Sequence, residues 1–341
     1  MARGSTPTLP PQGSRPRRLL FIHGRRWADH YVERILRAAV QNVEIQEGLR
    51  MLPVVDDVDI LVIDYDGLSN SERALFIETF ADYKHETRII ILSAGAVRDD
   101  LPMLFGAHVL TNLIARNDGV GAQELFVTLQ KLLRGDVFGI EKYFPWGTES
   151  LVCEIRGSVD REGVLDLTTG FAEARSVPPR FTELLLSVVD EMVTNAIYNA
   201  PVDAAGRFRY ASTDRRVPVQ LEPHESAVLK LACDGLRLGV SIADPFGSLS
   251  EPILLEYLAK CFRRDEDQVD QKEGGAGLGF YYILQSMSQL VVNINAKACT
   301  EVIGILDIRH GMRELAAAGK SFNVFTAGKR RALRAAVLPH E

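Results

Sequence analysis

Short apolar runs alternate with amphipathic segments between Arg18 and about Gly135. A strand covered on both faces reads as a continuous apolar run, whereas a covering helix repeats apolar residues three and four positions apart. The alternation therefore predicts a doubly wound parallel sheet with helices on both faces. The predicted strands are Leu19–His23, Val43–Glu47, Asp59–Asp64, Arg88–Ser93 and His108–Leu113, and the predicted helices are Trp27–Gln41, Ser71–Tyr83 and Ala122–Leu133.

The second half of the chain has a different order of elements. A long amphipathic helix is predicted at Thr182–Asn199, after the Pro178–Pro179 pair, which favours a helix start. Two further helices are predicted at Glu251–Arg263 and Gly279–Ser288. The remaining patterns predict strands at Leu151–Val159, Val164–Leu167, Val217–Leu221, Ala227–Cys233, Leu236–Ala243, Leu290–Lys297 and Val302–Ile308.

A change of composition separates the two halves. Residues 135–149 contain two glycine-aromatic pairs with a proline between them, which is typical of a connection rather than an element. At 341 residues the chain is also longer than one typical domain. We therefore expect a disordered tail at 1–17, domains at 18–135 and 150–315, a linker at 136–149 and a C-terminal extension at 316–341.

Charge and cysteine content narrow the classes of partner. The net charge is −6 and the pI is near 5.7, which gives no general attraction to nucleic acid or to an anionic membrane. The apolar runs are far shorter than the roughly 20 residues that cross a bilayer. The four cysteines show no CxxC spacing, which argues against a zinc ribbon or a disulfide framework. These features predict a cytoplasmic protein.

The long helix carries three polar residues of chemical interest. Glu191, Asn195 and Asn199 recur every four residues, so their side chains lie on one helix face. Polar residues at this spacing are usually the solvated side of a helix. Whether these residues form a functional site therefore depends on the elements that follow them in the sequence.

Two later segments give that context. The predicted strand Leu236–Ala243 ends in Asp244, and Gly247 follows it at a position where a ligand can approach the backbone. Residues 274–279 then read Gly-Gly-Ala-Gly-Leu-Gly and enter an apolar helix. Glycines before a helix expose unpaired N–H groups that can hold phosphate oxygens. A dinucleotide-binding reading is rejected because a charged segment, not a strand, precedes these glycines.

In this order, the three elements resemble the ATP-binding motifs of the GHKL superfamily, which includes sensor histidine kinases and anti-sigma-factor serine kinases. The resemblance covers residues from about 145 to 315 and implies an α+β two-layer sandwich, the Bergerat ATP-binding fold. It implies that Asn195 holds Mg²⁺, that Glu191 is the catalytic general base and that Asn199 contributes to the same nucleotide site. Asp244 would accept a hydrogen bond from the adenine amino group, and Gly247 would let the base approach.

The same resemblance implies roles for the glycine-rich segment and for one threonine. Gly275, Gly277, Leu278 and Gly279 would line the phosphates of ATP, and Thr300 would close the adenine pocket. The sequence departs from the family pattern in two places. Asn199 stands where a basic residue is common, and one of the two glycines usual after the aspartate is missing. Both departures put catalysis in doubt more than nucleotide binding.

The first half resembles a response-regulator receiver domain. Asp64 ends the third predicted strand, where receivers carry the phosphorylated aspartate, and Ser93 ends the next strand at the position of their hydroxyl switch residue. Receivers also need an acidic pair after the first strand, and here His23 is followed by Gly-Arg-Arg. We therefore interpret the domain as a pseudo-receiver in which Asp64 is an inactive phosphoacceptor, paired with Arg116 in a salt bridge.

These interpretations lead to two functional hypotheses. No histidine lies between His108 and His224, which disfavours a histidine kinase with an upstream phosphoaccepting helix. The leading hypothesis is a bacterial signalling protein that binds Mg-ATP and phosphorylates a protein partner on Ser or Thr, with regulation through the pseudo-receiver and possible homodimerisation. The alternative is a non-catalytic ATP-binding adaptor in a two-component-like pathway.

Overall fold

The apolar runs of the first half form a parallel sheet. The computed structural model describes residues 17–24, 30–49, 58–81, 87–95, 97–116, 121–264 and 275–327. Its first strands pair in the order β2-β1-β3-β4-β5, and all of these pairs are parallel. This is a doubly wound order. The strands are β1 (Arg18–His23), β2 (Asn42–Glu47), β3 (Ile60–Asp64), β4 (Arg88–Ser93) and β5 (Asn112–Ala115).

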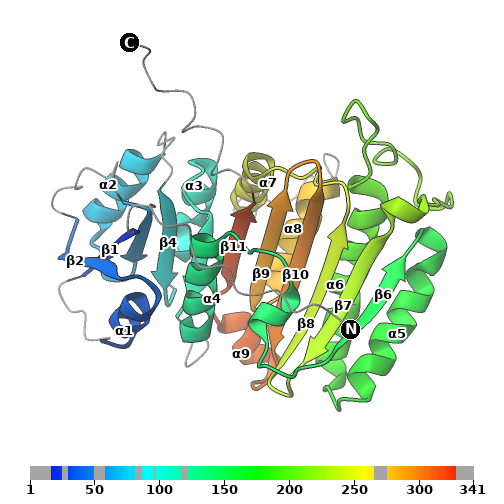
Figure 1. Ribbon diagram of the computed structural model, residues 1–341, viewed down its shortest axis with the longest axis horizontal. Helices are drawn as coiled ribbons and strands as arrows, with labels where there is room; N and C mark the ends of the chain where they lie inside the picture. Colours follow the sequence, from blue (N-terminus) through cyan, green and yellow to red (C-terminus); the bar gives the residue numbers. More distant parts are fainter. Residues whose placement is uncertain are drawn as a thin grey trace, which may run out of the picture.

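Helices cover both faces of this parallel region (Figure 1). One face is packed by α1 (His30–Ala39) and α4 (Gly121–Arg134), which contact each other. The other face is packed by α2 (Asn70–Phe80) and α3 (Leu101–Gly106), which follows the short helix η2 (Arg98–Asp100). The first turn of α2 is fixed by a capping box between Ser69 and Glu72, which satisfies backbone N–H groups at the helix start.

The second half is mainly an antiparallel sheet with helices on one face. The strands are β6 (Ser150–Ile155), β7 (Ala227–Cys233), β8 (Arg237–Asp244), β9 (Gln289–Asn295) and β10 (Cys299–Asp307). The covering helices are α5 (Arg161–Glu173), α6 (Pro179–Thr194), α7 (Glu251–Arg264) and α8 (Gly275–Ser286). Shorter elements are η3 (Ile140–Tyr143), η4 (Ser158–Asp160), η5 (Asn195–Asn199), η6 (Pro223–Glu225) and α9 (Met312–Ala317).

Two predicted strands of this half differ from the structure. The prediction at Val164–Leu167 is wrong, because these residues belong to α5. Buried residues of α5 recur at helical spacing, as at Val164, Thr168 and Phe171, and the short apolar run alone could not distinguish the two periods. At Val217–Leu221 the structure forms only an isolated bridge, between Gln220 and Gly157.

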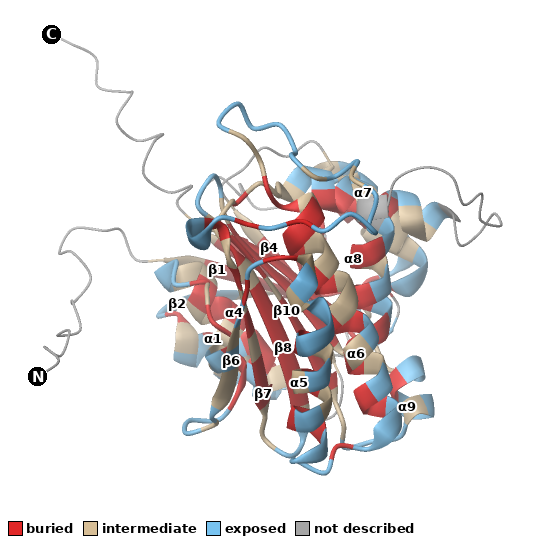
Figure 2. Cartoon of the chain, turned by 90° about the vertical axis from the view of Figure 1, so that its right-hand side faces the viewer, coloured by how far each residue is buried: buried red, intermediate tan, exposed pale blue. Residues whose placement is uncertain are grey.

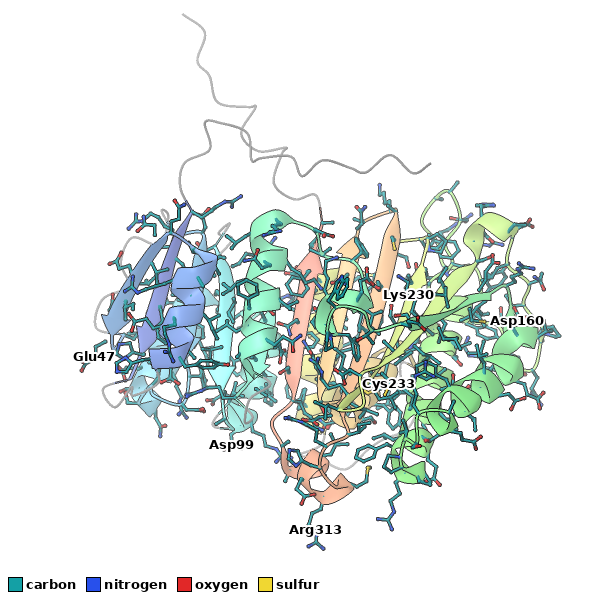
Figure 3. The ribbon with its side chains drawn as sticks, turned by 60° about the horizontal axis from the view of Figure 1, so that its bottom comes forward. Glu47, Asp99, Asp160, Lys230, Cys233 and Arg313 are labelled. Carbon is teal, nitrogen blue, oxygen red and sulfur yellow. The ribbon has the colours of Figure 1, made fainter. Side chains whose placement is uncertain are left out.

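The last strand, β11 (Ser321–Thr326), joins the two halves into one sheet. It pairs antiparallel with β5 and parallel with β9. The result is a single sheet of eleven strands in the order β2-β1-β3-β4-β5-β11-β9-β10-β8-β7-β6. Residues 321–326, which the sequence analysis places in a C-terminal extension, therefore lie near the centre of the fold. The edge strands β2 and β6 lie at opposite ends of the sheet (Figure 1), and Figure 3 shows Glu47 of β2 far from Asp160 of η4, which follows β6.

The hydrophobic core on the helix face also runs through both halves. Side chains of α2 and α3 belong to the same buried cluster as those of α5 to α8, and the central strands beneath them are mostly buried (Figure 2). At the junction α3 packs on α7. The Phe105 ring stacks on that of Phe262 with centroids 5.5 Å apart and meets the edge of Phe322 at 5.3 Å.

The segment between the halves covers the opposite face of the sheet. Val137, Ile140, Tyr143 and Phe144 are buried against β7, β9, β10 and β11. The predicted linker 136–149 is thus in part a packed layer. None of the helices in the described ranges combines the length and apolar character needed to cross a bilayer.

Replacing Phe322 by alanine tests the role of β11. The side chain is fully buried between the halves, so Phe322→Ala should lower the free energy of unfolding by about 3–5 kcal/mol. Urea unfolding followed by circular dichroism and tryptophan fluorescence should show one shared transition in the wild type and the variant. Phe126→Ala, at a phenylalanine 42% exposed on α4, is the control and should cost less than about 1 kcal/mol. Two separate wild-type transitions would show that the halves fold independently.

Candidate functional site

The C-terminal end of α6 continues into a π-helical turn at the two predicted asparagines. In η5 the N–H of Ala200 donates to the carbonyl of Asn195, five residues earlier, at 2.9 Å. Such turns are rare and occur often at functional sites, because they re-aim side chains at a helix end. Here the turn directs Asn195 and Asn199 toward the space between α6, β8 and α8.

The three polar residues of this helix are linked in one hydrogen-bonded row. Asn195 donates its Nδ2 to Glu191 Oε1 at 3.0 Å, and Asn199 donates its Nδ2 to Asn195 Oδ1 at 2.6 Å. Arg215 extends the row by donating to Asn199 Oδ1 at 3.3 Å. Burial raises the pKa of Glu191, against the opposing effect of its hydrogen bond from Asn195. The predicted common face is therefore confirmed as a connected polar row.

A cavity of about 280 Å³ opens beside this row. Asn195, Asn199, Asp244 and Thr300 all contribute to its lining. The structure thus brings together four site residues predicted from three separate parts of the sequence. Most of the remaining wall is apolar, with contributions from Met192, Ile242, Ile253, Phe280, Ile283 and Val302.

Asp244 and Thr300 face each other on neighbouring strands of the sheet. They are direct partners in the antiparallel pairing of β8 with β10. Asp244 is 9% exposed, and its Oδ1 accepts hydrogen bonds from the N–H groups of Phe246 at 2.9 Å and Gly247 at 3.4 Å. Burial raises the pKa of Asp244 to about 6 despite these bonds. The Thr300 hydroxyl is buried without a hydrogen-bond partner among the described residues.

Gly247 has a structural role next to the cavity. Its φ angle is +57°, in the left-handed region that favours glycine. A Cβ atom at this position would collide with the carbonyl oxygen of Asn295, at the turn between β9 and β10. The missing side chain therefore makes room for the backbone of a neighbouring hairpin, and Gly247 does not line the cavity.

The glycine-rich segment begins α8 against the polar row of α6. The helix starts at Gly275, so Gly277, Leu278 and Gly279 lie in its first turns. A Cβ atom on Gly279 would collide with the Glu191 carboxylate and come within 3.2 Å of Asn195 Nδ2. Leu278 is 63% exposed and does not line the cavity. Residues 265–274, including the first glycine of the run, lie outside the described residues.

The loop that follows η5, residues 200–222, borders the cavity and was not predicted from the sequence. Phe208 and Ala211 of this loop contribute to the lining. The Arg215 guanidinium lies 4.1 Å from the centre of the Tyr198 ring, which ties the loop to η5. The sequence feature that could have indicated this loop is a group of closely spaced arginines in a segment with no predicted helix or strand, namely Arg207, Arg209, Arg215 and Arg216.

The phosphoacceptor-like position of the first half is held by an ion pair. Asp64 is 4% exposed, and Arg116 Nη1 lies 3.3 Å from its Oδ1. The predicted salt bridge is confirmed. Ser93 donates its hydroxyl to Asp66 Oδ1 at 2.7 Å. Both residues that would switch in a receiver are therefore engaged by neighbouring side chains in this structure.

Comparisons with known proteins leave the family open. No protein-family model matches the chain, and no curated protein matches it in sequence. A SiaB–SiaC complex structure from Pseudomonas aeruginosa shares 15% identity over 45% of this chain and 88% of that chain, with a TM-score of 0.31. Homoserine dehydrogenase from S. aureus shares 12% identity over 91% of this chain and 99% of that chain, with a TM-score of 0.19. Both TM-scores are too low to establish a shared fold.

The raised pKa of Asp244 predicts a specific pH dependence of stability. A carboxyl with a folded-state pKa above its unfolded value of 3.8 binds protons more tightly when folded, so stability falls as the pH rises from about 4 to about 6. The loss should be on the order of 2–3 kcal/mol. Asp244→Asn should remove this contribution from urea unfolding curves measured across the window. Equal pH slopes for wild type and variant would contradict the prediction.

Proposed function

We propose that the cavity beside η5 binds an adenine nucleotide with Mg²⁺, in a GHKL-type domain of a signalling protein. The observation that carries the proposal is the Asp244–Thr300 pair at the wall of an otherwise apolar cavity. A flat heterocycle with a polar edge suits such a site, because the apolar walls contact its faces and a few polar groups fix its orientation. The ionised Asp244 accepts a hydrogen bond from an exocyclic amino group, and the unpartnered Thr300 hydroxyl is available to a ring nitrogen.

The phosphate end of the nucleotide would lie at the start of α8. The first N–H groups of a helix carry no intrahelical partner and favour negative charge. The contact of Gly279 with Glu191 and Asn195 places this helix start next to the polar row. Within the described ranges, no group of three or more His, Cys, Asp or Glu side chains could hold a metal ion. Asn195 is the residue of the polar row that would hold Mg²⁺, which would offset the charge of the phosphates.

Glu191 is the residue of this site suited to proton transfer. Its carboxylate is held by Asn195 at 3.0 Å, and burial raises its pKa toward the value that general-base catalysis favours. When bound, Mg²⁺ and ATP would supply a polarised γ-phosphoryl group. Glu191 would accept the proton of an attacking Ser or Thr hydroxyl from a partner protein, as in anti-sigma-factor kinases.

The first half would regulate this site through direct contact. The α3 helix packs on α7, and the Phe105–Phe262 stack lies at that contact. The α7 helix ends at Arg264, immediately before the segment that leads to the glycines of α8. Because α7 contributes Ile253 and Tyr257 to the cavity lining, a partner that moves α3 would act on the wall of this site. Asp64 is held in an ion pair with Arg116. The signal received by this half would therefore be contact with a protein and not phosphorylation of Asp64.

Nucleotide binding is tested by calorimetry with ATP and Mg²⁺. The wild type should bind saturably, and Asp244→Ala should lose the interaction with the base. Asp166→Ala, on α5 and outside the cavity, is the matched control and should bind like the wild type. Affinity should rise with pH through about 6, because only the ionised Asp244 accepts the amino proton. No binding by the wild type would overturn the nucleotide proposal.

Catalysis is tested separately with Glu191→Gln. If Glu191 is the general base, this variant should keep its affinity for ATP while phosphoryl transfer or hydrolysis falls by about 10²–10⁴-fold. Turnover is measured by release of labelled phosphate and by transfer to candidate partners. Binding without turnover in the wild type would favour the non-catalytic adaptor, the alternative that the Asn199 substitution supports. Unchanged turnover in Glu191→Gln would remove Glu191 from the mechanism.

A further inference from the structure

The loop of residues 200–222 carries four arginines, and one of them differs from the rest in its partners. Three of the arginines each form an ion pair with a nearby carboxylate: Arg207 with Asp203, Arg209 with Glu225, and Arg216 with Asp214. The fourth, Arg215, has no carboxylate within ion-pair distance among the described residues, and its Nη2 donates instead to Asn199 Oδ1 at 3.3 Å. Arg215 therefore brings a positive charge to the polar row without a directly paired carboxylate.

Tyr198 holds Arg215 at the end of this row. The guanidinium carbon lies 4.1 Å from the centre of the Tyr198 ring, and the Tyr198 hydroxyl donates to the Arg215 carbonyl at 3.3 Å. Tyr198 itself is 3% exposed, so it gives the loop a fixed point of attachment to η5. The N–H donors of a guanidinium lie in its plane, so a group that stacks by its face keeps them for other partners. The Arg215 side chain is exposed and can turn toward a ligand without disturbing the core.

The hydrogen bonds of the row all run in one direction, from Arg215 to Glu191. A guanidinium can only donate, and a carboxylate can only accept. Between them, Asn199 and Asn195 each accept with the amide oxygen and donate with the amide nitrogen. Burial raises the pKa of Glu191, and the positive charge of Arg215 is one of the effects that oppose this rise. The row therefore has an anionic end at Glu191 and a cationic end at Arg215.

The cavity beside η5 lacks a cation of its own. None of the described side chains that line it belongs to Lys, Arg or His, whereas Asp244 contributes a carboxyl group. Glu191 lies next to the lining residue Asn195 and adds a second one. The phosphates of ATP carry more negative charge than one Mg²⁺ neutralises. Repulsion between phosphates and carboxylates is strong in a partly buried site, so a further cation near the row would favour binding.

We propose that Arg215 binds the phosphates of the nucleotide, so that the cavity beside η5 selects phosphorylated nucleotides over nucleosides. This inference rests on the proposed nucleotide site, in which the phosphates lie at the start of α8 next to the polar row. The guanidinium fork matches the oxygens of a phosphate group, and a charged oxygen is a stronger acceptor than the Asn199 amide. Phe208 and Ala211 of the same loop line the cavity, so the phosphate contact also holds the loop against the ligand.

The test uses ligands that differ only in their phosphates. Adenosine, AMP, ADP and ATP are titrated into the full chain by calorimetry with Mg²⁺, and adenosine is also measured by competition with ATP. Arg215→Ala should lower the affinity for ATP by roughly 10–100-fold and leave that for adenosine unchanged. The first member of the series to show the loss identifies the phosphate that Arg215 contacts. Arg215→Lys, which keeps the charge but not the planar fork, should retain part of the affinity for ATP.

Arg216→Ala is the matched control, because it removes the neighbouring arginine whose charge Asp214 already balances. It should bind all four ligands like the wild type. If Arg215→Ala binds ATP as tightly as Arg216→Ala does, the inference is overturned and the nucleotide site stands. If Arg215→Ala weakens adenosine and ATP by the same factor, Arg215 has a structural role and the inference is again overturned. If the wild type binds none of the four ligands, the nucleotide proposal itself fails, and the inference fails with it.

Discussion

The structure depends on a single strand that comes from the end of the described chain and lies near the centre of the sheet. β11 pairs with β5 on one side and with β9 on the other. Without it, the parallel and antiparallel regions would each expose an edge with unpaired backbone groups. Its side chains are buried on both faces, with Phe322 among the helices of one face and Phe325 under the cover of the other. The two halves therefore share one continuous sheet. Pairing with β11 on one side and β8 on the other fixes the register of β9 and β10, which positions Thr300 opposite Asp244.

Buried polar contacts add specificity to this junction. Lys131 of α4 donates to Asn293 Oδ1 at 2.9 Å and to the Tyr143 hydroxyl at 2.8 Å. Glu301 accepts from Asn293 Nδ2 and from Ser241, each at 2.8 Å. Desolvation lowers the pKa of Lys131, and the negative charge of Glu301 partly offsets that effect. Groups of this kind contribute little net stability but penalise any other docking of α4, because a shifted helix would leave a buried charge unpaired. The same helix carries Glu124, which accepts hydrogen bonds from Ser321 and Asn323 of β11.

What could be predicted from the sequence was mostly local. The row formed by Glu191, Asn195 and Asn199 follows from helical spacing, and β1, β3 and β4 follow from continuous apolar runs. The fifth strand was predicted too early, at His108–Leu113, whereas β5 is Asn112–Ala115. The Asp64–Arg116 pair was predicted from the receiver resemblance, in which a basic residue after the fifth strand lies beside the aspartate. The position of β11 in the sheet could not be predicted, because it depends on pairing with a strand about 200 residues earlier. The periodicity of apolar residues carries no information about such a pairing. The hydrogen bond between Glu124 and Ser321 was missed for the same reason, because the two residues meet only through that pairing. The π-turn at η5 shifts the backbone hydrogen bonds by one residue but leaves the pattern of polar and apolar residues unchanged, so it could not be predicted either.

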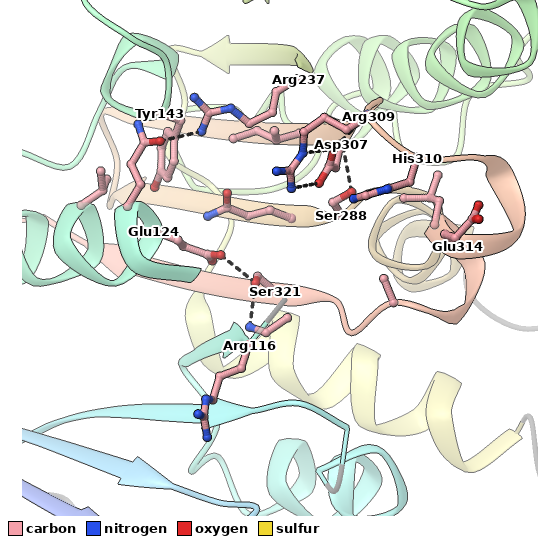
Figure 4. A pocket seen from close by; sticks show the side chains of 17 residues that line it. Arg116, Glu124, Tyr143, Arg237, Ser288, Asp307, Arg309, His310, Glu314 and Ser321 are labelled. Carbon is pink, nitrogen blue, oxygen red and sulfur yellow. Dashed lines mark hydrogen bonds and ion pairs between the residues drawn. The ribbon is translucent and has the colours of Figure 1, made fainter. Parts of the chain in front are cut away.

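A second cavity, of about 350 Å³ (Figure 4), lies at the opposite end of β10 from the cavity beside η5, and this limits how ligands in the two cavities could influence each other. Thr300 and Val302 of β10 line the cavity beside η5, whereas Ile305 and Asp307 of the same strand line the second cavity. A central strand cannot slip in register, since a shift of one residue would exchange the side chains of its two faces. Coupling by a register slip of β10 is therefore disfavoured. The helix layer has more freedom, because packed helices can shift by small amounts without breaking backbone pairs. The contact of α3 with α7, next to Phe322 of β11, is consequently a physical route by which events in the first half can reach the cavity beside η5, which α7 also lines.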